Sequence, residues 1–472
     1  MTLKRSMRMQ VLAAVPLLFC GCLSRLVSRS AGRGGVVIAA NVAGEPALAA
    51  ARDASTGRSY FAWASLRGSG GPRFTLASAG KSGKAERVWS AAGGAGTVQS
   101  EPGLSLSSSS LYASWIENSS GTLSLKAAVY DLRGAEPPLE GVVSGLIGRI
   151  KNRVGITSSG KDSVFLSWED FNPALRTPFA GVAEVGRGGV KWEKLLGNRA
   201  AEEEYMSPAI APDGAGGVFA AFRHIHNGDR GIVLNHFSAD GASWADDAQA
   251  NAFLGYQSGP VLAPSPEGGL FLIWEDGRNG SIDIYGQKFS SGGAALWDPD
   301  GIPLEAADGN QWNPVIVPDA AGGFFCAWID DDRGTNLQIE VQRIDKDGHP
   351  LWGRDGVAVS PSDSRQSDIS MVTDGAGGVI LAWNEPRYGY LDVFAQRLGP
   401  DGSLKWGNGG TAVTADKHDQ VAPVMAPGGN GGALITWKRR RGRNSWEIRS
   451  QLLGPDGAAQ WPAPPRVPGR PR

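Results

Sequence analysis

An aromatic residue recurs at almost constant spacing along the chain, and this spacing constrains the fold more than any other feature. The segments that carry it, from YFAWAS to LITWKR, place it at Trp63, Trp115, Trp168, Phe222, Trp274, Trp328, Trp383 and Trp437. A second series follows the first by 22 to 26 residues in every unit except the second, at Trp89, Trp192, Trp244, Trp297, Trp352, Trp406 and Trp461. A fixed period of this length is typical of repeat architectures. We therefore interpret these tryptophans as structural.

Each unit is expected to contain four short strands joined by tight turns. In the sixth unit the strands are NPVIVPD, FFCAWID, LQIEVQRID and GVAVS, and IEVQRI alternates as a sheet with two differently packed faces requires. Eight such units predict an all-β chain folded as an eight-bladed β-propeller with four-stranded antiparallel blades. A solenoid of the same units is the alternative.

The two ends of the repeat region predict how the ring closes. The last unit runs into WPAPPRVPGRPR, whose prolines make a poor ladder strand, whereas GVVIAA (35–40) precedes the first unit as GVAVS precedes the seventh. We expect the N-terminal strand to complete the last blade, which removes the open sheet edges. Proline is also expected to open many of the innermost strands, at Pro46, Pro102, Pro208, Pro260, Pro314 and Pro423.

The first 34 residues are predicted to be an export signal and a tether. Lys4, Arg5 and Arg8 precede an apolar run over residues 9–19, which is too short to span a bilayer as a helix. The run ends at Phe19-Cys20-Gly21-Cys22, which resembles a bacterial lipobox, with Phe19 where leucine is usual. We predict a signal peptide over residues 1–22 with lipidation at Cys22, a tether over 23–34, a propeller over 35–462 and a tail over 463–472. Ordinary cleavage near this point is the alternative.

This N-terminus predicts an exported protein, periplasmic or at the cell surface as an outer-membrane lipoprotein, or else secreted. Lipid would then be its only contact with the membrane. After processing, Cys326 would be the only free cysteine, so no intrachain disulfide is expected. The 46 Lys and Arg nearly balance the 47 Asp and Glu, which argues against a nucleic-acid partner. We expect a monomer without a cofactor.

The units with the strongest repeat pattern resemble a known class of secreted protein. FLIWEDGRNGSIDIYGQKF, FCAWIDDDRGTNLQIEVQRID and ILAWNEPRYGYLDVFAQRLGPDGSLKW resemble the bacterial repeat proteins with a W-x-D-x-R-x-G-x-x-D-I-Y-x-Q pattern. That resemblance implies a propeller and no particular activity.

The unit endings carry a second, more distant resemblance. Their Gly-x-x-x-Trp spacing, at Gly293, Gly348, Gly402 and Gly457, resembles the Asp-box turns of sialidase-like propellers and the tryptophan-docking turns of quinoprotein propellers. In an Asp-box one residue separates the aspartate from the glycine, whereas here Asp347, Asp401 and Asp456 adjoin their glycines. In either family these turns are structural.

The segment WEDGRNGSIDIYGQ (274–287), called the hairpin template below, contains an acid and an arginine that recur in other units. A catalytic residue is needed once, so repetition favours a structural role. We interpret Asp276 and Arg278 as a brace for the hairpin turn, worth about 0–1 kcal/mol if exposed. A ring of charges that recognises a ligand is the alternative.

The fourth unit departs from the hairpin template. FRHIHNGDRGIVLNHF aligns with it without a gap and places His224 and His226 where Asp276 and Arg278 stand. Side chains two residues apart on a strand share a face, and Glu202, Glu203 and Glu204 enter the same unit on the same rim. Two histidines with carboxylates could bind zinc or transfer protons. His236 should lie too far down the ladder to be a third histidine ligand, so we favour a solvated polar turn without metal.

The eighth unit departs in charge. Its cations, Lys438, Arg439, Arg440, Arg441 and Arg443, precede Trp446 and could hold an anionic polymer by charge and stacking. A solvated hairpin tip is the simpler interpretation. Asp330, Asp331 and Asp332 of the sixth unit are considered for calcium, but consecutive acids rarely converge on one ion.

The function favoured by the sequence is a binding or scaffolding module at the cell envelope, with an envelope protein or an anionic glycan as partner. No nucleophile elbow, phosphate-binding loop or HExxH motif is present in the sequence, so a non-enzymatic role is preferred. The alternative is a carbohydrate-active hydrolase or lyase of sialidase-like architecture, for which the sequence does not select a pair of carboxylates.

Overall fold

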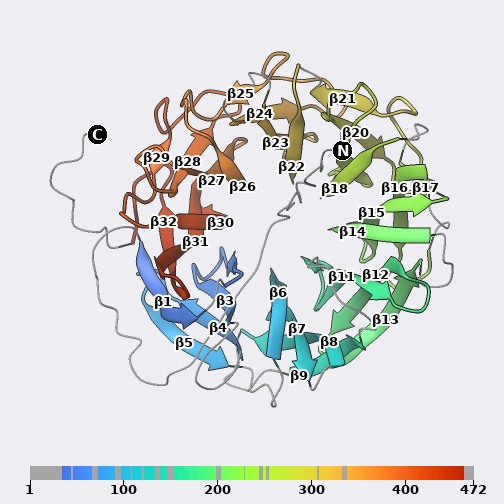
Figure 1. Cartoon of the computed structure of the whole chain (residues 1–472), viewed down its shortest axis with the longest axis horizontal. Helices are drawn as coiled ribbons and strands as arrows, with labels where there is room; N and C mark the ends of the chain where they lie inside the picture. Colours follow the sequence, from blue (N-terminus) through green and yellow to red (C-terminus); the bar gives the residue numbers. More distant parts are fainter. Residues whose placement is uncertain are drawn as a thin grey trace, which may run out of the picture.

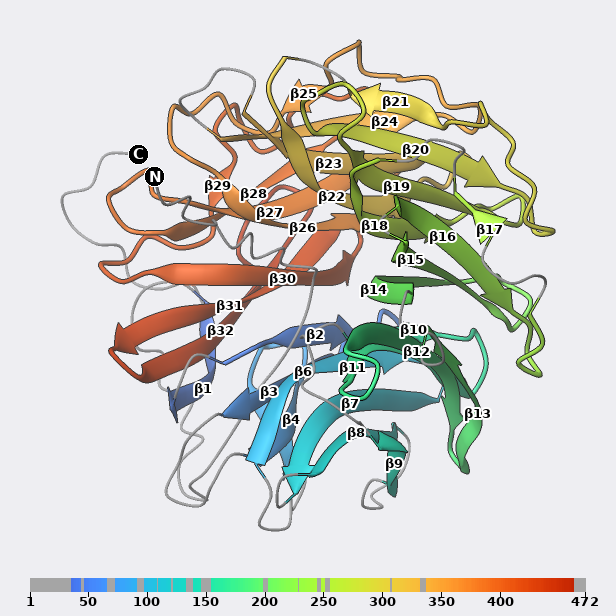
Figure 2. The ribbon, with the colours of Figure 1, turned by 45° about the vertical axis from the view of Figure 1, so that its right-hand side comes forward.

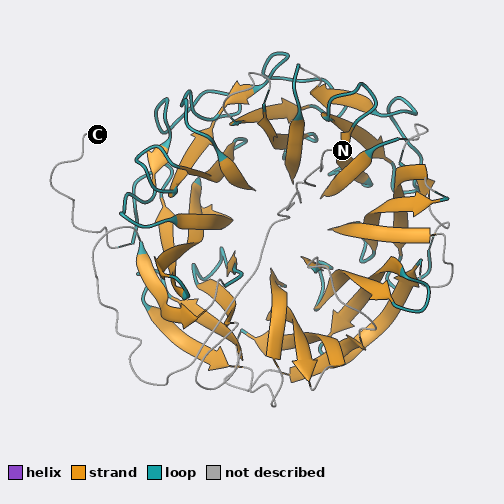
Figure 3. Ribbon diagram, viewed as in Figure 1, coloured by secondary structure: helices purple, strands orange, loops and turns teal. Residues whose placement is uncertain are grey.

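A computed structural model shows eight four-stranded sheets arranged in a ring (Figure 1). It describes residues 35–461 except 44–45, 66–72, 91–96, 108, 120–121, 133–138, 146–153, 198–202, 228, 244–247, 251–254, 306–307 and 332–336. Over this part of the chain the elements are strands and loops (Figure 3). The predicted all-β, eight-bladed propeller is confirmed. Cys22, the predicted signal peptide, the tether and residues 463–472 lie outside the described part.

Each blade uses four consecutive strands, except the last. Blade 1 contains β2 (Ala49–Arg52), β3 (Ser59–Ser65), β4 (Arg73–Ala79) and β5 (Ala85–Ser90). Blade 2 contains β6 (Thr97–Leu106), β7 (Ser110–Ser119), β8 (Thr122–Asp131) and β9 (Leu139–Gly145). Blade 3 contains β10 (Gly155–Ser158), β11 (Ser163–Asn172), β12 (Thr177–Gly186) and β13 (Gly189–Leu196). Blade 4 contains β14 (Glu203–Pro212), β15 (Val218–His226), β16 (Asp229–Phe237) and β17 (Ala248–Gln249).

The second half of the ring follows the same order. Blade 5 contains β18 (Gln257–Pro264), β19 (Leu270–Asp276), β20 (Asp283–Phe289) and β21 (Ile302–Glu305). Blade 6 contains β22 (Gln311–Pro318), β23 (Phe324–Asp330), β24 (Gln338–Ile344) and β25 (Val357–Ala358). Blade 7 contains β26 (Ser367–Thr373), β27 (Val379–Glu385), β28 (Asp392–Leu398) and β29 (Thr411–Ala412). Blade 8 contains β30 (Gln420–Gly429), β31 (Gly432–Gly442), β32 (Ser445–Leu453) and β1 (Val36–Ala43).

The N-terminal strand closes the ring, as predicted. Strand β1 pairs antiparallel with β32, from Val36 opposite Ser450 to Ala43 opposite Ser445 (Figure 2). A side chain makes a second closure, because the Trp461 indole Nε1 donates to the Lys81 carbonyl at 3.0 Å. Blade 8 is therefore joined to blade 1 in two ways. Strand β1 belongs to the sheet of blade 8 and leads directly into blade 1, and Trp461 of blade 8 contacts Lys81 of blade 1.

The first tryptophan series forms the centre of the blades. Each member lies on the second strand of its blade and is at most 3% exposed, including Phe222, which replaces tryptophan in blade 4. Large aromatic side chains in this position fill the space between neighbouring sheets. The structural role predicted for this series is confirmed.

The second tryptophan series joins neighbouring blades. Trp352 of blade 6 donates its indole hydrogen to the Pro400 carbonyl of blade 7 at 3.1 Å, and Trp406 of blade 7 donates to Pro455 of blade 8 at 3.0 Å. Each ring packs on the glycine of the next unit, where a Cβ on Gly402 would lie 3.0 Å from Trp352. That glycine has φ +79, which a side chain disfavours. The side chain of Trp89 and residue Trp244 fall outside the described part.

Most of the prolines that were expected to open the innermost strands lie inside them. Pro46 precedes β2, whereas Pro102 lies inside β6. Pro208, Pro260, Pro314 and Pro423 also lie inside their strands, each within a β-bulge. The residue before each has a positive φ, as Asn313 does at 55°. A bulge interrupts ladder pairing, so a proline within it removes no ladder hydrogen bond from the sheet.

Side chains from the preceding blade hold these bulges in place. The Asn313 backbone N–H donates to Glu275 at 2.9 Å, and the Ala422 N–H donates to Asn384 at 2.9 Å. In blade 4 the Ser207 N–H donates to Glu169 at 2.9 Å. The residue after the core tryptophan therefore links its blade to the next one.

Candidate functional site

The hairpin template of blade 5 is a buried brace. Asp276 is 0% exposed and accepts hydrogen bonds from the Trp274 indole Nε1 at 2.8 Å and from Arg278 Nη2 at 2.7 Å. The Arg278 guanidinium stands 4.1 Å from the centre of the Tyr285 ring. Burial lowers the pKa of Arg278, but the hydrogen bond and charge of Asp276 outweigh burial and raise it above its ordinary value.

Blade 7 repeats this brace with a longer acid. Glu385 is 0% exposed and accepts from the Trp383 indole at 2.9 Å and from Arg387 Nη2 at 2.8 Å, and Arg387 stands 4.1 Å from the Phe394 ring centre. Because these acids are buried, removing one partner would cost more than the 0–1 kcal/mol expected for an exposed pair. The repeated acid and arginine thus make structural contacts.

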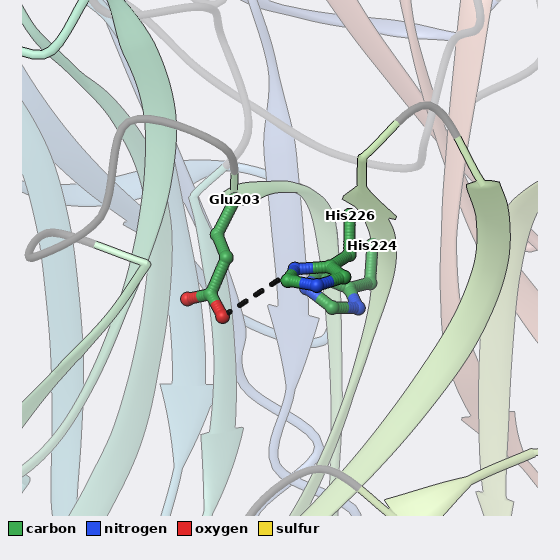
Figure 4. A group of neighbouring side chains, drawn as sticks. All are labelled: Glu203, His224 and His226. Carbon is green, nitrogen blue, oxygen red and sulfur yellow. Dashed lines mark ion pairs between the residues drawn. The ribbon is translucent and has the colours of Figure 1, made fainter.

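Blade 4 changes three positions of the hairpin template together. Phe222 has no indole N–H, so it cannot hold an acid as Trp274 does, and His224 and His226 occupy the positions of the acid and the arginine. Both histidines lie at the end of β15, and Glu203 begins the neighbouring strand β14 directly opposite His226 (Figure 4). The structure brings these three predicted residues together.

The three side chains are close enough to share one ligand. Their ligand atoms all lie within 4.8 Å of one another, and His226 Nδ1 lies 3.7 Å from Glu203 Oε1. The side chains of His226 and Glu203 are 52% and 34% exposed, so the cluster is open to solvent. This arrangement can bind a cation or exchange a proton with a ligand.

Neighbouring groups support the two histidines differently. The His224 ring packs 4.5 Å from the ring of Tyr205 and 6.1 Å from the ring of His226. The side-chain amide of Asn227 lies 2.9 Å from His226 Nε2. His224 is thus held by aromatic packing, and His226 by a polar neighbour.

The other predicted residues of blade 4 lie elsewhere. Glu204 pairs with Ile225, one residue out of step with Glu203, so it belongs to the opposite face of the strand. Glu202 lies outside the described residues. His236 is opposite Phe219, well down the ladder, and lies 2.9 Å from Asp213, as expected for a histidine that is not part of the cluster.

The basic run of blade 8 divides between buried and exposed residues. Lys438 and Arg439 are both 8% exposed, which differs from the expected solvated tip. Arg439 donates from Nε to Asp416 at 2.9 Å and from Nη1 to Glu447 at 3.2 Å. One carboxylate from the connection before β30 and one from β32 neutralise this arginine, so the chain can bury it.

Three arginines of the same run remain at the surface. The side chains of Arg440 and Arg441 are 50% and 48% exposed, and Arg443 is exposed at the hairpin tip. Trp446, expected to stack on a ligand, is only 7% exposed and lies under Lys438 and Arg440, whose charges are 5.9 and 6.0 Å from its ring centre. It packs within the blade.

Two exposed tyrosines that sequence reasoning missed lie on the neighbouring hairpin of the same rim. Tyr388 and Tyr390 are 40% and 42% exposed at the hairpin tip of blade 7. Asp419 connects the tips, because its carboxylate accepts from the Leu391 N–H at 3.4 Å and its carbonyl from the Arg440 N–H at 2.9 Å. The signal in the sequence is PRYGY where the template has GRNGS. Together Tyr388, Tyr390, Arg440, Arg441 and Arg443 are called the tyrosine–arginine patch.

The acids considered for calcium do not converge. Asp330 is buried in β23 at 7% exposure, whereas Asp331 accepts from the Asn310 backbone N–H at 2.5 Å, and Asp332 lies outside the described residues. Cys326 is fully buried, and burial raises the pKa of its thiol well above the ordinary value, so it is unreactive. In the part of the chain that the structure describes, no helix is long and apolar enough to cross a membrane.

Comparisons with known proteins show a likeness in fold to solved structures. No protein-family model and no curated protein matches the chain. A eukaryotic initiation factor is 12% identical, with a TM-score of 0.48 over 91% of this chain and 94% of that one. A prolyl endopeptidase is 13% identical, with a TM-score of 0.44 over 85% of this chain, which spans 54% of that protein. A Hadza microbial sialidase is 13% identical, with a TM-score of 0.38 over 72% of this chain and 76% of that one. The likeness to such β-propeller proteins is one of fold alone.

Proposed function

We propose that this protein is an exported, lipid-anchored β-propeller that serves as a binding module at the cell envelope, with an anionic glycan as its ligand. The signal-like N-terminus and the lipobox-like segment ending at Cys22 support export and anchoring. The hairpin template supports a place among the secreted bacterial repeat propellers.

The tyrosine–arginine patch is the observation that carries this proposal. Exposed tyrosine rings can pack against sugar rings, while exposed guanidinium groups bind carboxylates or phosphates in two-pronged fashion. The patch joins two neighbouring blades on one rim, which suits a polymer better than a small molecule. Template residues such as Asp276 and Glu385 are buried in the brace, whereas the patch arginines are exposed, even where Arg441 also donates to Glu447 at 2.7 Å.

Binding of acidic polysaccharides tests the ligand. Full-length protein in detergent is titrated with heparin and with neutral dextran, and we expect it to bind heparin alone, more weakly as salt rises. The triple variant Arg440→Ala, Arg441→Ala and Arg443→Ala should bind heparin at least tenfold more weakly, and Tyr388→Ala with Tyr390→Ala should also weaken it. Arg354→Ala removes an arginine that is 86% exposed in blade 6 and serves as the matched control.

Two outcomes would count against this function. Equal heparin affinity in the triple variant and the Arg354→Ala control would exclude the patch as the binding surface. Release of reducing or unsaturated ends from the same polysaccharide would favour the hydrolase or lyase alternative. The anchor is tested separately: Cys22→Ser should move the protein from the membrane to the soluble fraction of cells.

A further inference from the structure

We propose that Glu203, His224 and His226 form a zinc-binding site on the rim of blade 4. Two imidazoles and one carboxylate are a donor set that zinc accepts in sites with three protein ligands. The site is independent of the tyrosine–arginine patch, because blades 4 and 8 lie on opposite sides of the ring (Figure 1).

The distances fit a tetrahedral zinc ion after small side-chain rotations. Zinc bonds of about 2.0–2.2 Å place the ligand atoms of a tetrahedral site about 3.3–3.6 Å apart. His226 Nδ1 and Glu203 Oε1 are 3.7 Å apart, and the full set lies within 4.8 Å. Because His226 and Glu203 are half-exposed and lie on one face of the pair (Figure 4), they can close this gap without moving the backbone.

The backbone beneath the site is a hydrogen-bonded ladder of three strands. Glu203 is paired with His226, and Tyr205 with His224, in an antiparallel ladder that continues from β15 into β16. Alternation along β15 puts both histidines on the face where Glu203 lies opposite. The site therefore rests on two hydrogen-bonded strands, which hold ligands more rigidly than a loop does.

A neighbouring side chain can orient one ligand. Asn227 lies 2.9 Å from His226 Nε2, on the ring nitrogen opposite the one that faces Glu203. The atom at this distance is the amide nitrogen Nδ2, so with zinc on Nδ1 and the proton on Nε2 the Asn227 amide turns over and accepts from Nε2 through its oxygen. Such outer hydrogen bonds fix the ring and typically raise metal affinity by about 10–100-fold.

The substitutions in blade 4 are those a metal site requires. The brace in blade 5 needs an indole donor, an acid and an arginine, and blade 4 has lost all three. Removing the arginine charge and supplying imidazoles replaces a buried ion pair with two imidazole rings beside the Glu203 carboxylate, which are donors that zinc accepts. Three protein ligands also leave a coordination position for water or for a donor from a bound partner.

Zinc titration of the full-length, untagged protein tests the site. Calorimetry with ZnCl₂ on chelator-treated protein should show one zinc per chain, and cobalt should give the visible absorption of a tetrahedral site. His226→Asn and Glu203→Gln should each weaken zinc binding at least tenfold, and Asn227→Gly, which keeps the positive φ of this turn residue without strain, should weaken it about tenfold. His349→Asn changes a histidine that is 73% exposed in blade 6 and should bind zinc as the wild type does.

Melting temperatures without metal distinguish lost ligands from lost folding, since all four variants change exposed or half-exposed residues and should melt as the wild type does. Absence of zinc binding to the wild type would overturn the proposal. Equal affinity in His226→Asn and His349→Asn would overturn it as well, because zinc would then bind elsewhere.

Discussion

At the scale of single residues, most of the hairpin template is explained by contacts within the fold. Trp274 fills the blade, Glu275 holds the bulge of the next blade, and Asp276 joins the indole to Arg278. Gln287 accepts from the Trp297 N–H at 3.0 Å and donates to the Asp298 carbonyl, which positions the connection to the outer strand. The acid and the arginine therefore recur in other blades because the tryptophan that donates to the acid recurs there too.

Trp328→Ala is expected to destabilise the protein by about 3–5 kcal/mol, because this side chain is 0% exposed and its removal leaves a cavity between sheets. Urea unfolding followed by circular dichroism measures the change. Leu351→Ala, in the same blade and 49% exposed, should shift the unfolding free energy by less than about 0.5 kcal/mol. An unchanged transition in Trp328→Ala would contradict the packing described for this series.

Asp416 is expected to make stability depend on acid pH. Burial raises the pKa of its carboxyl, but the hydrogen bond from His418 and the charge of Arg439 outweigh burial and hold the pKa below its ordinary value of 3.8. The ionised carboxylate therefore stabilises the fold above pH 3.8, and this contribution disappears as pH falls through the folded-state pKa.

Unfolding midpoints of wild type and Asp416→Asn, compared from pH 6 to pH 2, measure this contribution. The wild type should be the more stable at pH 6, and the difference should shrink steadily below pH 4. Asp355→Asn, with a side chain that is 81% exposed, should follow the wild type throughout. A difference that stays constant with pH would show that Asp416 does not act through its charge.

At the scale of elements, the tryptophan-docking turns hold neighbouring blades together. The Gly-x-x-x-Trp spacing lies within one unit, yet each tryptophan packs on the glycine of the following unit, as Trp406 does on Gly457. The glycine and the tryptophan of one unit therefore belong to two different contacts, the glycine with the preceding unit and the tryptophan with the following one. Their recurrence connects blades in sequence around the ring.

Gly402→Ala is expected to destabilise the ring by at least about 1 kcal/mol more than Gly407→Ala. Both glycines have a positive φ, +79 and +81, so both variants pay the same backbone strain. Only at Gly402 does the new Cβ meet Trp352, at 3.0 Å, whereas nothing lies within 4 Å at Gly407. Denaturant unfolding of the two variants compares them, and equal losses would show that docking contributes little.

At the scale of the whole molecule, closure depends on a strand that is remote in sequence from its partners. Strand β1 completes the sheet of β30, β31 and β32, so its loss would leave β32 as an open edge. Open edges pair with other chains.

A chain beginning at residue 45 lacks β1 and is expected to aggregate and to melt at a lower temperature than a chain beginning at residue 35. Size-exclusion chromatography and thermal unfolding measure both effects. The chain beginning at residue 35 should remain monomeric, because it keeps the whole of β1. Two monomeric chains with the same melting temperature would show that closure through β1 is dispensable.

The strand content could be read from the sequence because alternation and the aromatic of the second strand recur within each repeat. The blade number follows from how often the repeat occurs. The ring closure follows from comparing the two ends of the repeat region, where a strand-like segment precedes the first unit and prolines end the last. The site was only partly predictable. His224 and His226 were identified as departures from the template, with Glu203 on the same rim. The sequence did not show that Glu203, and not a third histidine, lies close enough to be the third ligand.

The tertiary structure alone decided the contacts between strands and between blades. It placed Glu203 opposite His226, buried Arg439 between Asp416 and Glu447, and joined the hairpins of blades 7 and 8 through Asp419. Sequence by itself determined a closed ring of eight blades, because its repeat is a property of composition and spacing. It did not determine these neighbours, because they depend on strand register, and a one-residue bulge like the one that contains Pro208 changes which side chains share a face.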